Sequence, residues 1–290
     1  MGTKGRAIVS RIASHDRTAV FVNDPSAKAV ISRSEPFRVY RQLADGDVRR
    51  FSNLLVLSCA SRLSSAAKVI RAANQAHCLR VLLVRADVEH DLLPQILARA
   101  NIRTLRNMLV HSDYEMPRRV LGAWRAGAQD QLIAAATVLD KTIIVLSCAM
   151  ERFELPARQL PGLERASADQ LASLEVDEDG SYIYWPQLDV HHNLDSIRYL
   201  TDPDWRRDKD IEAATSMESS ARAVAEIRKH HGLRQADVPG LSERQVRRIE
   251  GGARPTAKAL KALAGAHGMS FSDYMEAIAR LARDKASPSA

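Results

Sequence analysis

The chain has 290 residues, of which 46% are hydrophobic and 27% are charged, and its formal net charge is +7. This length and composition are typical of two or three compact globular domains and exclude a largely disordered chain. No stretch reaches the roughly 18 consecutive apolar residues of a membrane-spanning helix, and the first residues lack a secretory signal, so we expect no membrane association.

Residues 1–130 are predicted to form an α/β region. The runs at 53–58 and 79–85 are continuously apolar and of strand length, and residues 64–76 between them have helical spacing. This pattern predicts a β–α–β unit whose strands are buried on both faces. Two further helical stretches are expected, one over residues 91–110 that is broken near Pro94 and Asn101, and one over 117–128. A role in dimerisation or sensing is the hypothesis for this region.

Residues 131–205 are predicted to form a small α+β domain. Two apolar strands, 131–139 and 142–149, flank Asp140 and Lys141, which indicates a hairpin. A second hairpin is expected around Asp179 and Gly180, because Asp-Gly is a strong turn signal. Short helices are expected over residues 163–173 and 193–200, with a linker over 206–218.

Aromatic and histidine residues in the second hairpin offer a weak binding hypothesis. Tyr182, Tyr184 and Trp185 are more typical of a sheet core than of a stacking surface. His191 and His192 are adjacent in an extended segment, so their side chains should point to opposite faces and cannot readily share a metal ion. We therefore predict no metal site and no cofactor.

The segment DEDGSYIYWPQLDV, followed by LDSIRYL, resembles a bacterial domain-of-unknown-function family, number 2442. The likeness runs from the hairpin at residue 131 to Leu200. It implies a small α+β architecture, sometimes fused to a helix-turn-helix domain, and it implies no activity.

Charge and cysteine content separate the chain into modules and suggest its compartment. Residues 1–130 carry 21 Lys or Arg against 11 Asp or Glu, residues 131–215 carry 8 against 16, and residues 216–290 carry 13 against 8. Basic ends favour polyanionic partners, and the acidic middle favours either a basic partner or the protein's own basic surfaces. Three widely spaced cysteines in apolar sequence predict buried thiols in the cytoplasm.

Residues 219–290 are predicted to form a bundle of short helices. A helix over 220–232 ends at a glycine, a single turn follows at 234–238, and Ser242 with Gln245 forms a capping box. In the helix from Glu243, Val246 and Ile249 are three residues apart and should face inward. Two more helices are expected, over 258–268 and 271–282.

The segments IRKHHGLRQADV, GLSERQVRRIEGG and RPTAKALKALAGAHGMS resemble the helix-turn-helix domain of the xenobiotic-response-element and Cro-type regulators. The resemblance covers about 65 residues and implies an all-α, lambda-repressor-like DNA-binding fold. One departure is the first helix of the motif, which is short and ends at Pro239 and Gly240.

The helix from Glu243 is predicted to read DNA in the major groove, because its first two turns present arginine, glutamine and glutamate side chains that can bond to base edges. The resemblance implies base contacts by Glu243, Arg244, Gln245 and Arg248. The resemblance places Arg234, Gln235, Arg247, Arg254 and Lys258 at DNA phosphates.

The sequence therefore predicts a cytoplasmic, sequence-specific transcriptional regulator that acts as a homodimer on a palindromic operator and has no enzymatic activity of its own. One alternative is an antitoxin-like protein whose acidic middle domain neutralises a basic partner. A second alternative is a DNA-targeted enzyme with chemistry in residues 1–130, where no acid–base or metal cluster is evident in the sequence.

Overall fold

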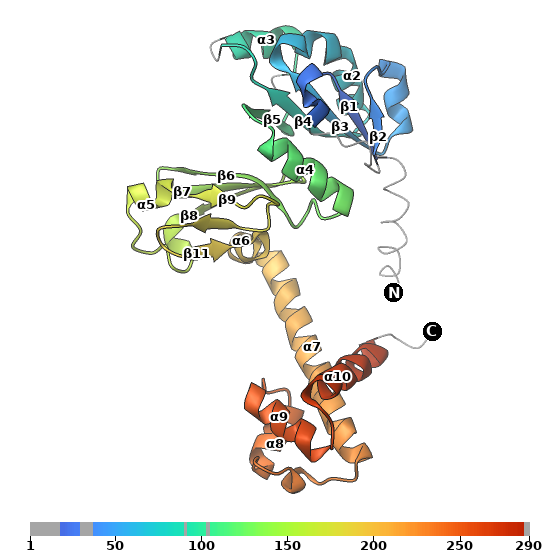
Figure 1. Ribbon diagram of the computed structural model, residues 1–290, viewed down its shortest axis with the longest axis vertical. Coiled ribbons are helices and arrows are strands. Elements are labelled where there is room, and N and C mark those ends of the chain that lie inside the picture. Colours follow the sequence, from blue (N-terminus) through green and yellow to red (C-terminus); the bar gives the residue numbers. More distant parts are fainter. Residues whose placement is uncertain (1–17, 30–36, 90–91, 103–104, 287–290) are drawn as a thin grey trace. The chain divides into compact units, whose positions relative to one another are not determined.

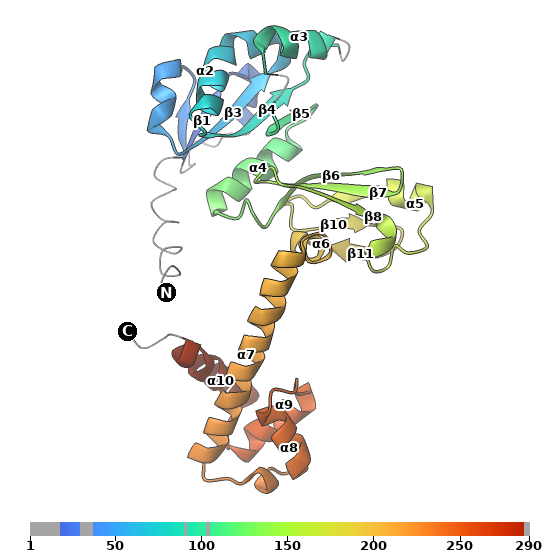
Figure 2. The same ribbon diagram turned by 180° about the vertical axis from the view of Figure 1, so that it is seen from behind.

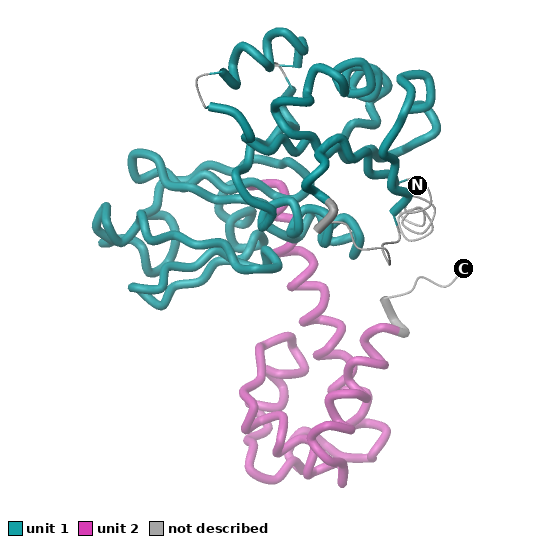
Figure 3. Tube along the Cα trace, turned by 45° about the horizontal axis from the view of Figure 1, so that its top comes forward, with its two compact units in different colours: residues 1–201 teal, residues 202–290 magenta. Residues whose placement is uncertain are grey.

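The computed structural model describes residues 18–29, 37–89, 92–102 and 105–286. The chain divides into two compact units, Met1–Thr201 and Asp202–Ala290, which Figure 3 colours separately. Within the described ranges, no helix combines the length and apolarity needed to cross a membrane.

A five-stranded, fully parallel sheet forms the first part of unit 1, with strand order β2-β1-β3-β4-β5. Its strands are β1 (Thr18–Val22), β2 (Arg38–Tyr40), β3 (Asn53–Cys59), β4 (Leu79–Arg85) and β5 (Met108–His111). The helical elements are η1 (Pro25–Ala29), η2 (Asp45–Arg50), η3 (Ala60–Arg62), α2 (Leu63–Gln75), α3 (Leu93–Ala100) and α4 (Glu115–Ala126). The predicted β–α–β unit is confirmed as β3, α2 and β4.

Helices cover both faces of this sheet (Figure 1). Side chains of α2 and α3 pack on one face and those of α4 on the other. The continuous apolar runs of β3 and β4 follow from this arrangement, because both faces of each strand are covered.

The break expected near Asn101 is confirmed, but the segment after it contains a strand where a helix was expected. The segment expected to be helical over 91–110 ends its helix at Ala100, where Asn101 adopts a left-handed conformation with φ 54°. Met108–His111 then pairs with β4 as an edge strand. Three apolar residues are too few for periodicity to separate a strand from a helix, so pairing with β4 decides the outcome.

The second part of unit 1 contains two three-stranded antiparallel sheets, with orders β6-β7-β8 and β11-β10-β9. The strands are β6 (Ile133–Leu139), β7 (Thr142–Ser147), β8 (Arg152–Pro156), β9 (Glu175–Val176), β10 (Ile183–Trp185) and β11 (Val190–His192). The helices are η5 (Ala157–Gln159), α5 (Ala168–Ala172) and α6 (Leu194–Thr201).

The predicted turn at Asp140 and Lys141 joins β6 to β7, and both residues have positive φ angles of 47° and 63°. The helix expected over 163–173 is shorter, because α5 begins only after Ser167, which forms a capping box with Gln170. The sheets enclose a core that includes the fully buried Trp185.

The two parts of unit 1 are packed together. The indole nitrogen of Trp124 in α4 donates a hydrogen bond of 2.9 Å to the carbonyl oxygen of Cys148. Ala134 and Cys148 also belong to the apolar core that α4 forms on the parallel sheet. The predicted boundary at residue 130 therefore separates two sheet architectures within one compact unit.

The three cysteines, Cys59, Cys78 and Cys148, are free and buried, as the sequence predicts. Burial raises the pKa of the Cys148 thiol to about 12. A thiol with such a pKa is protonated at neutral pH and is therefore a poor nucleophile and metal ligand.

Unit 2 is entirely helical among its described residues (Figures 1 and 2). Its elements are α7 (Pro203–His230), η6 (Gln235–Asp237), α8 (Glu243–Glu250), α9 (Ala257–Ala266) and α10 (Phe271–Ala286). The segment predicted as a linker, 206–218, is instead the exposed first half of α7. This helix starts from Asp202, whose carboxylate accepts hydrogen bonds from the backbone N–H groups of Asp204 and Trp205.

The second half of α7 packs against α8 and α10. Val224, Ile227 and Arg228 are buried on one face of α7, and the chain turns at Gly232 with φ 69°. A single core joins α7, α8, α9 and α10 around Val246, Leu263 and Tyr274. The predicted helices after residue 257 are present.

Candidate nucleic-acid interface

The helix α8 is short and both of its ends are fixed by side-chain or backbone hydrogen bonds. Ser242 accepts a hydrogen bond of 3.3 Å from the backbone N–H of Gln245, and the Gln245 side chain accepts one of 2.8 Å from the backbone N–H of Ser242. At the other end, Gly251 donates to the Arg247 carbonyl and Gly252 has φ 93°. The capping box predicted from the sequence and the two glycines at the other end therefore define the ends of α8.

The helix α8 presents one apolar face and one cationic face. Val246 and Ile249 are 0% and 7% exposed and anchor the helix in the core of unit 2. At about 100° per residue, Arg244 lies near the middle of the opposite face, with Arg247 and Arg248 on either side. All three arginines are exposed. The sequence prediction that Arg244 and Arg248 face outward agrees with this arrangement.

The side chains of Arg244 and Arg248 form no hydrogen bond or ion pair with any other residue in the described ranges. Each carries five N–H donors and a charge that is not lost at neutral pH. These donors are free to bind an external acceptor without first breaking an internal contact.

Two other predicted base-contact residues are already engaged. The carboxylate of Glu243 pairs with Arg247 one turn later. The Gln245 side-chain oxygen accepts hydrogen bonds from both the backbone N–H and the hydroxyl of Ser242. A bidentate contact with adenine needs both the oxygen and the nitrogen of the amide, so Gln245 would have to leave the cap to make it.

A buried ion pair fixes α8 against α7. Arg228 in α7 donates through Nη2 to Glu250 at 3.0 Å and through Nη1 to the carbonyl oxygen of Leu233. Both charged side chains are only 8% exposed. Burial alone would raise the pKa of Glu250, but hydrogen bonds from Arg228 and Gln235 outweigh burial and hold that pKa below its ordinary value. Both partners therefore stay ionised, and the pair holds α8 at a set position on α7.

The predicted phosphate contacts occupy different environments. The amide nitrogen of Gln235 donates to Glu250 at 2.7 Å, so this side chain supports α8 from η6. Arg234 is exposed and forms an ion pair with Asp237. Arg254 lies in the loop after α8, and Lys258 lies in the first turn of α9; both are exposed.

A second buried group in unit 2 has no partner for its polar atoms. His267 is 5% exposed and stacks on Tyr274, with ring centroids 5.2 Å apart and planes at 21°. Neither ring nitrogen of His267 nor the Tyr274 hydroxyl has a hydrogen-bond partner among the described residues. Burial lowers the pKa of His267, and the nearby His231 and Arg228 lower it further.

The free energy of unfolding of unit 2 should therefore depend on the protonation of His267. The folded unit favours the neutral imidazole, so below the ordinary pKa of about 6.5 the unfolded chain binds the extra proton. Stability is complete above pH 6.5 and falls as the pH decreases towards the lowered pKa, by at most about 1.4 kcal/mol per pH unit. Thermal unfolding followed by circular dichroism between pH 7.5 and 5.5 measures this slope.

The substitution His267→Phe keeps a ring against Tyr274 and removes the titrating group. We expect it to reduce the dependence of unit 2 stability on pH in this range and to raise stability at pH 5.5. An unchanged pH dependence in His267→Phe would show that another group causes the effect.

The sequence reasoning missed a polar network at the carboxyl ends of the parallel strands. Asp24, just after β1, is 2% exposed, and its carboxylate accepts two hydrogen bonds from Arg85 at 2.8 and 3.0 Å. The Tyr114 hydroxyl donates to the same carboxylate at 2.8 Å. Burial would raise the pKa of Asp24, but Arg85, the Ser26 backbone and Tyr114 hold it below its ordinary value. Its acceptor positions are filled from within the chain.

Ligands of α/β folds bind at this edge, where the strand order reverses between β1 and β3. There, Asn23 after β1 donates to the hydroxyls of Ser58 and Ser65, and Asp87 after β4 accepts from Ser61 at 2.5 Å. The signal for this network was available in the sequence, since Asn23-Asp24 and Arg85-Ala86-Asp87 each follow an apolar run directly.

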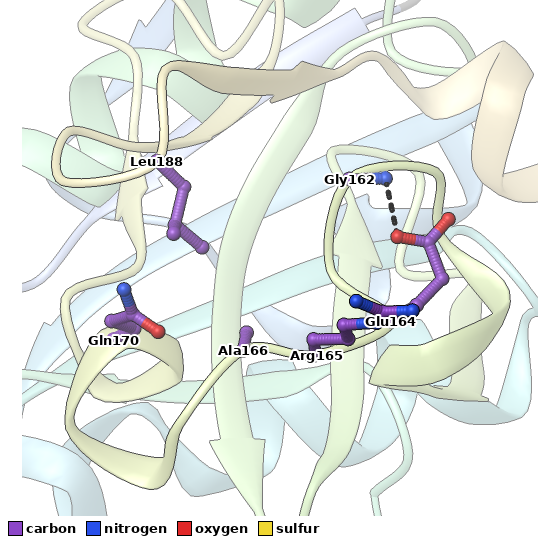
Figure 4. A pocket seen from close by; sticks show the side chains of 6 residues that line it. All are labelled: Gly162, Glu164, Arg165, Ala166, Gln170 and Leu188. Atoms are coloured by element: carbon purple, nitrogen blue, oxygen red, sulfur yellow. Dashed lines mark hydrogen bonds between the residues drawn. The ribbon is translucent and has the colours of Figure 1, made fainter.

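An open pocket of about 570 Å³ lies in the second part of unit 1 (Figure 4). Its lining residues are Gly162, Glu164, Arg165, Ala166, Gln170 and Leu188. Two of its polar groups serve the loop itself, since Glu164 accepts a hydrogen bond from the Gly162 backbone and Gln170 from the Ser167 backbone. The pocket brings together no arrangement of acid, base and nucleophile.

The predicted separation of the two histidines is confirmed. His191 is exposed beside Tyr182 and Tyr184, whereas a ring nitrogen of His192 lies 3.0 Å from the carbonyl oxygen of Pro161. Across the described ranges, no three His, Cys, Asp or Glu side chains are grouped closely enough to hold a metal ion.

One comparison with known protein families places a match in the second part of unit 1. Residues 133–201 match the model of a family described as a protein of unknown function, DUF2442. A crystal structure of a protein of unknown function from Rhodospirillum rubrum is 29% identical over 26% of this chain and 95% of that one, with a TM-score of 0.23. No curated protein matches the chain.

Proposed function

We propose that this chain is a sequence-specific DNA-binding transcriptional regulator that reads the major groove with α8. The observation that carries the proposal is the exposed cationic face of α8, where Arg244 and Arg248 have no internal partner among the described residues. Arginine binds guanine O6 and N7 with two hydrogen bonds, which is the commonest specific contact in DNA complexes. A protein with this role acts in the cytoplasm, on the chromosome.

The support around α8 suits a rigid reading helix. Val246 and Ile249 bury its inner face, and the Arg228–Glu250 pair joins its last turn to α7. Groups that recognise a partner bind more tightly when the protein holds them in place beforehand, because less conformational entropy is lost on binding. The preceding element, η6, is a single 3-10 turn, which supports a variant of the helix-turn-helix arrangement with a shortened first helix.

Exposed cations on neighbouring elements are placed to bind phosphates. We assign this role to Arg254 and Lys258, and to Arg234 once it leaves Asp237; Arg247 can join them once it leaves Glu243. Phosphate contacts set the position of a protein on the duplex and carry no sequence information directly. One domain of this kind makes few base contacts, so we propose that a homodimer binds two half-sites about one helical turn apart.

In vitro selection from a random duplex library with the full-length chain tests the proposal. We expect enrichment of one motif, with two half-sites centred about 10 base pairs apart. Enrichment no greater than that of a control protein would contradict sequence-specific binding.

The phosphate assignments predict a separate effect on the selected site. Arg254→Ala and Lys258→Ala should each weaken binding to specific and unrelated duplexes by similar factors and lower the salt slope of log Kd by about 1. Fluorescence anisotropy over a series of salt concentrations measures both quantities. Arg158→Ala, an exposed arginine of unit 1, is the matched control and should leave the slope unchanged.

A further inference from the structure

The outward face of the β9-β10-β11 sheet carries aromatic side chains that the core does not use. Ile183 and Trp185 in β10 point inward and are fully buried. Tyr182 and Tyr184 alternate with them and are only partly buried, so the expectation that both tyrosines belong to the sheet core is wrong. Tyr184 lies directly between His191 on β11 and Glu175 on β9.

Three rings form one group on this face. Tyr184 and His191 are nearly parallel, with planes at 14° and centroids 5.9 Å apart. Tyr182 stands edge-on to both, at 5.9 Å from Tyr184 and 5.2 Å from His191. The three rings together make a continuous aromatic surface at the outside of a small sheet, and we call it the ring cluster.

Carboxylates border the ring cluster. The Tyr184 hydroxyl donates a hydrogen bond to Glu175, and the Tyr182 hydroxyl is hydrogen-bonded to Asp177. These bonds raise the pKa of both tyrosines, so the phenols remain neutral at neutral pH. A phenol that donates to a carboxylate has a more electron-rich ring, and the negative face of the ring attracts cations more strongly.

The domain around the ring cluster is also negatively charged. Residues 131–201 contain 5 Lys or Arg against 11 Asp or Glu. An anionic domain attracts cationic partners and repels nucleic acid. The charge of this face is thus opposite to that of the exposed face of α8.

We infer that the ring cluster, with Glu175 and Asp177, binds an arginine side chain from a basic segment of a partner protein. The planar guanidinium stacks on a tyrosine face while its N–H groups donate to the neighbouring carboxylates. The ammonium of lysine is compact and strongly hydrated. It can therefore pair with the carboxylates, but its interaction with the aromatic rings is weaker than that of a guanidinium. This binding is independent of DNA recognition and gives the domain an interaction role of its own.

Isothermal titration of the full-length chain with an octa-arginine peptide, at about 150 mM salt to screen long-range attraction, tests the inference. We expect saturable binding, weaker binding of octa-lysine, and no binding of octa-glutamate. Tyr184→Leu should weaken octa-arginine binding about tenfold while it keeps every charge on the face. Tyr184→Phe keeps the ring and loses the bond to Glu175, so it should bind with intermediate affinity.

Tyr199→Leu, an exposed tyrosine on α6, is the matched control and should bind like the unmodified chain. Circular dichroism shows whether each variant is folded, and a folded Tyr184→Leu with undiminished affinity overturns the inference. So does the absence of saturable binding, or equal affinity for octa-arginine and octa-lysine. Tighter binding by the Arg244→Ala plus Arg248→Ala variant would assign the face to this chain's own α8 and would also overturn it.

Discussion

The double substitution Arg244→Ala plus Arg248→Ala is expected to abolish sequence-specific DNA binding. One bidentate arginine–guanine contact contributes about 1–3 kcal/mol of discrimination, so the loss of two should weaken binding to the selected site by roughly 30-fold to 10⁴-fold. Affinity for unrelated DNA should fall much less, because phosphate contacts supply most of it. Fluorescence anisotropy with the selected duplex and a scrambled duplex measures both affinities.

The variant should remain folded, because neither arginine side chain forms a hydrogen bond or ion pair in the described ranges and both are exposed. Arg280→Ala plus Arg283→Ala in α10 removes the same net charge from exposed positions of unit 2 and is the matched control. Equal losses in the two double variants would show that net charge alone drives binding, and the assignment of α8 as the reading helix would then be wrong.

The fold was predictable from the sequence where local patterns are long. Continuous apolar runs identified β3 and β4, and two apolar runs on either side of a two-residue turn identified β6 and β7. The exposed half of α7 was not predicted, because 206–218 has the polar composition of a linker. It is helical because capping at Asp202 starts the helix and the buried face from Ala221 onward continues it.

For the candidate interface, the sequence was enough to predict the exposed residues of α8 but not the buried contacts that support the helix. Helical spacing around Val246 and Ile249 was enough to predict which arginines of α8 face outward. The bonds from Arg228 and Gln235 to Glu250 join residues 22 and 15 positions apart, and Asp24 meets Tyr114 across 90 positions. The spacing of residues along the chain does not predict such distant pairs, because they form only when the elements pack together in the folded protein. The outward direction of Tyr184 depends likewise on which face of the small sheet the core covers.

The largest expected effect on stability is that of Glu250→Ala. This substitution leaves the Arg228 guanidinium buried, with only the Leu233 carbonyl as an acceptor, and it also removes the partner of Gln235. Removal of one member of a buried ion pair costs about 3–5 kcal/mol, because the other charge is left uncompensated in a poorly hydrated site. We expect the thermal transition of unit 2 to fall strongly, as measured by calorimetry of the full-length chain, with that of unit 1 unchanged.

Glu243→Ala breaks the other ion pair of α8 and is the matched control. The Glu243–Arg247 side chains are 52% and 68% exposed, and exposed pairs contribute only about 0–1 kcal/mol. The double variant Arg228→Met plus Glu250→Leu should recover most of the lost stability, because apolar replacement removes both charges together. If Glu250→Ala costs no more than Glu243→Ala, the buried pair does not hold α8 against α7, and another contact must fix the cationic face in position.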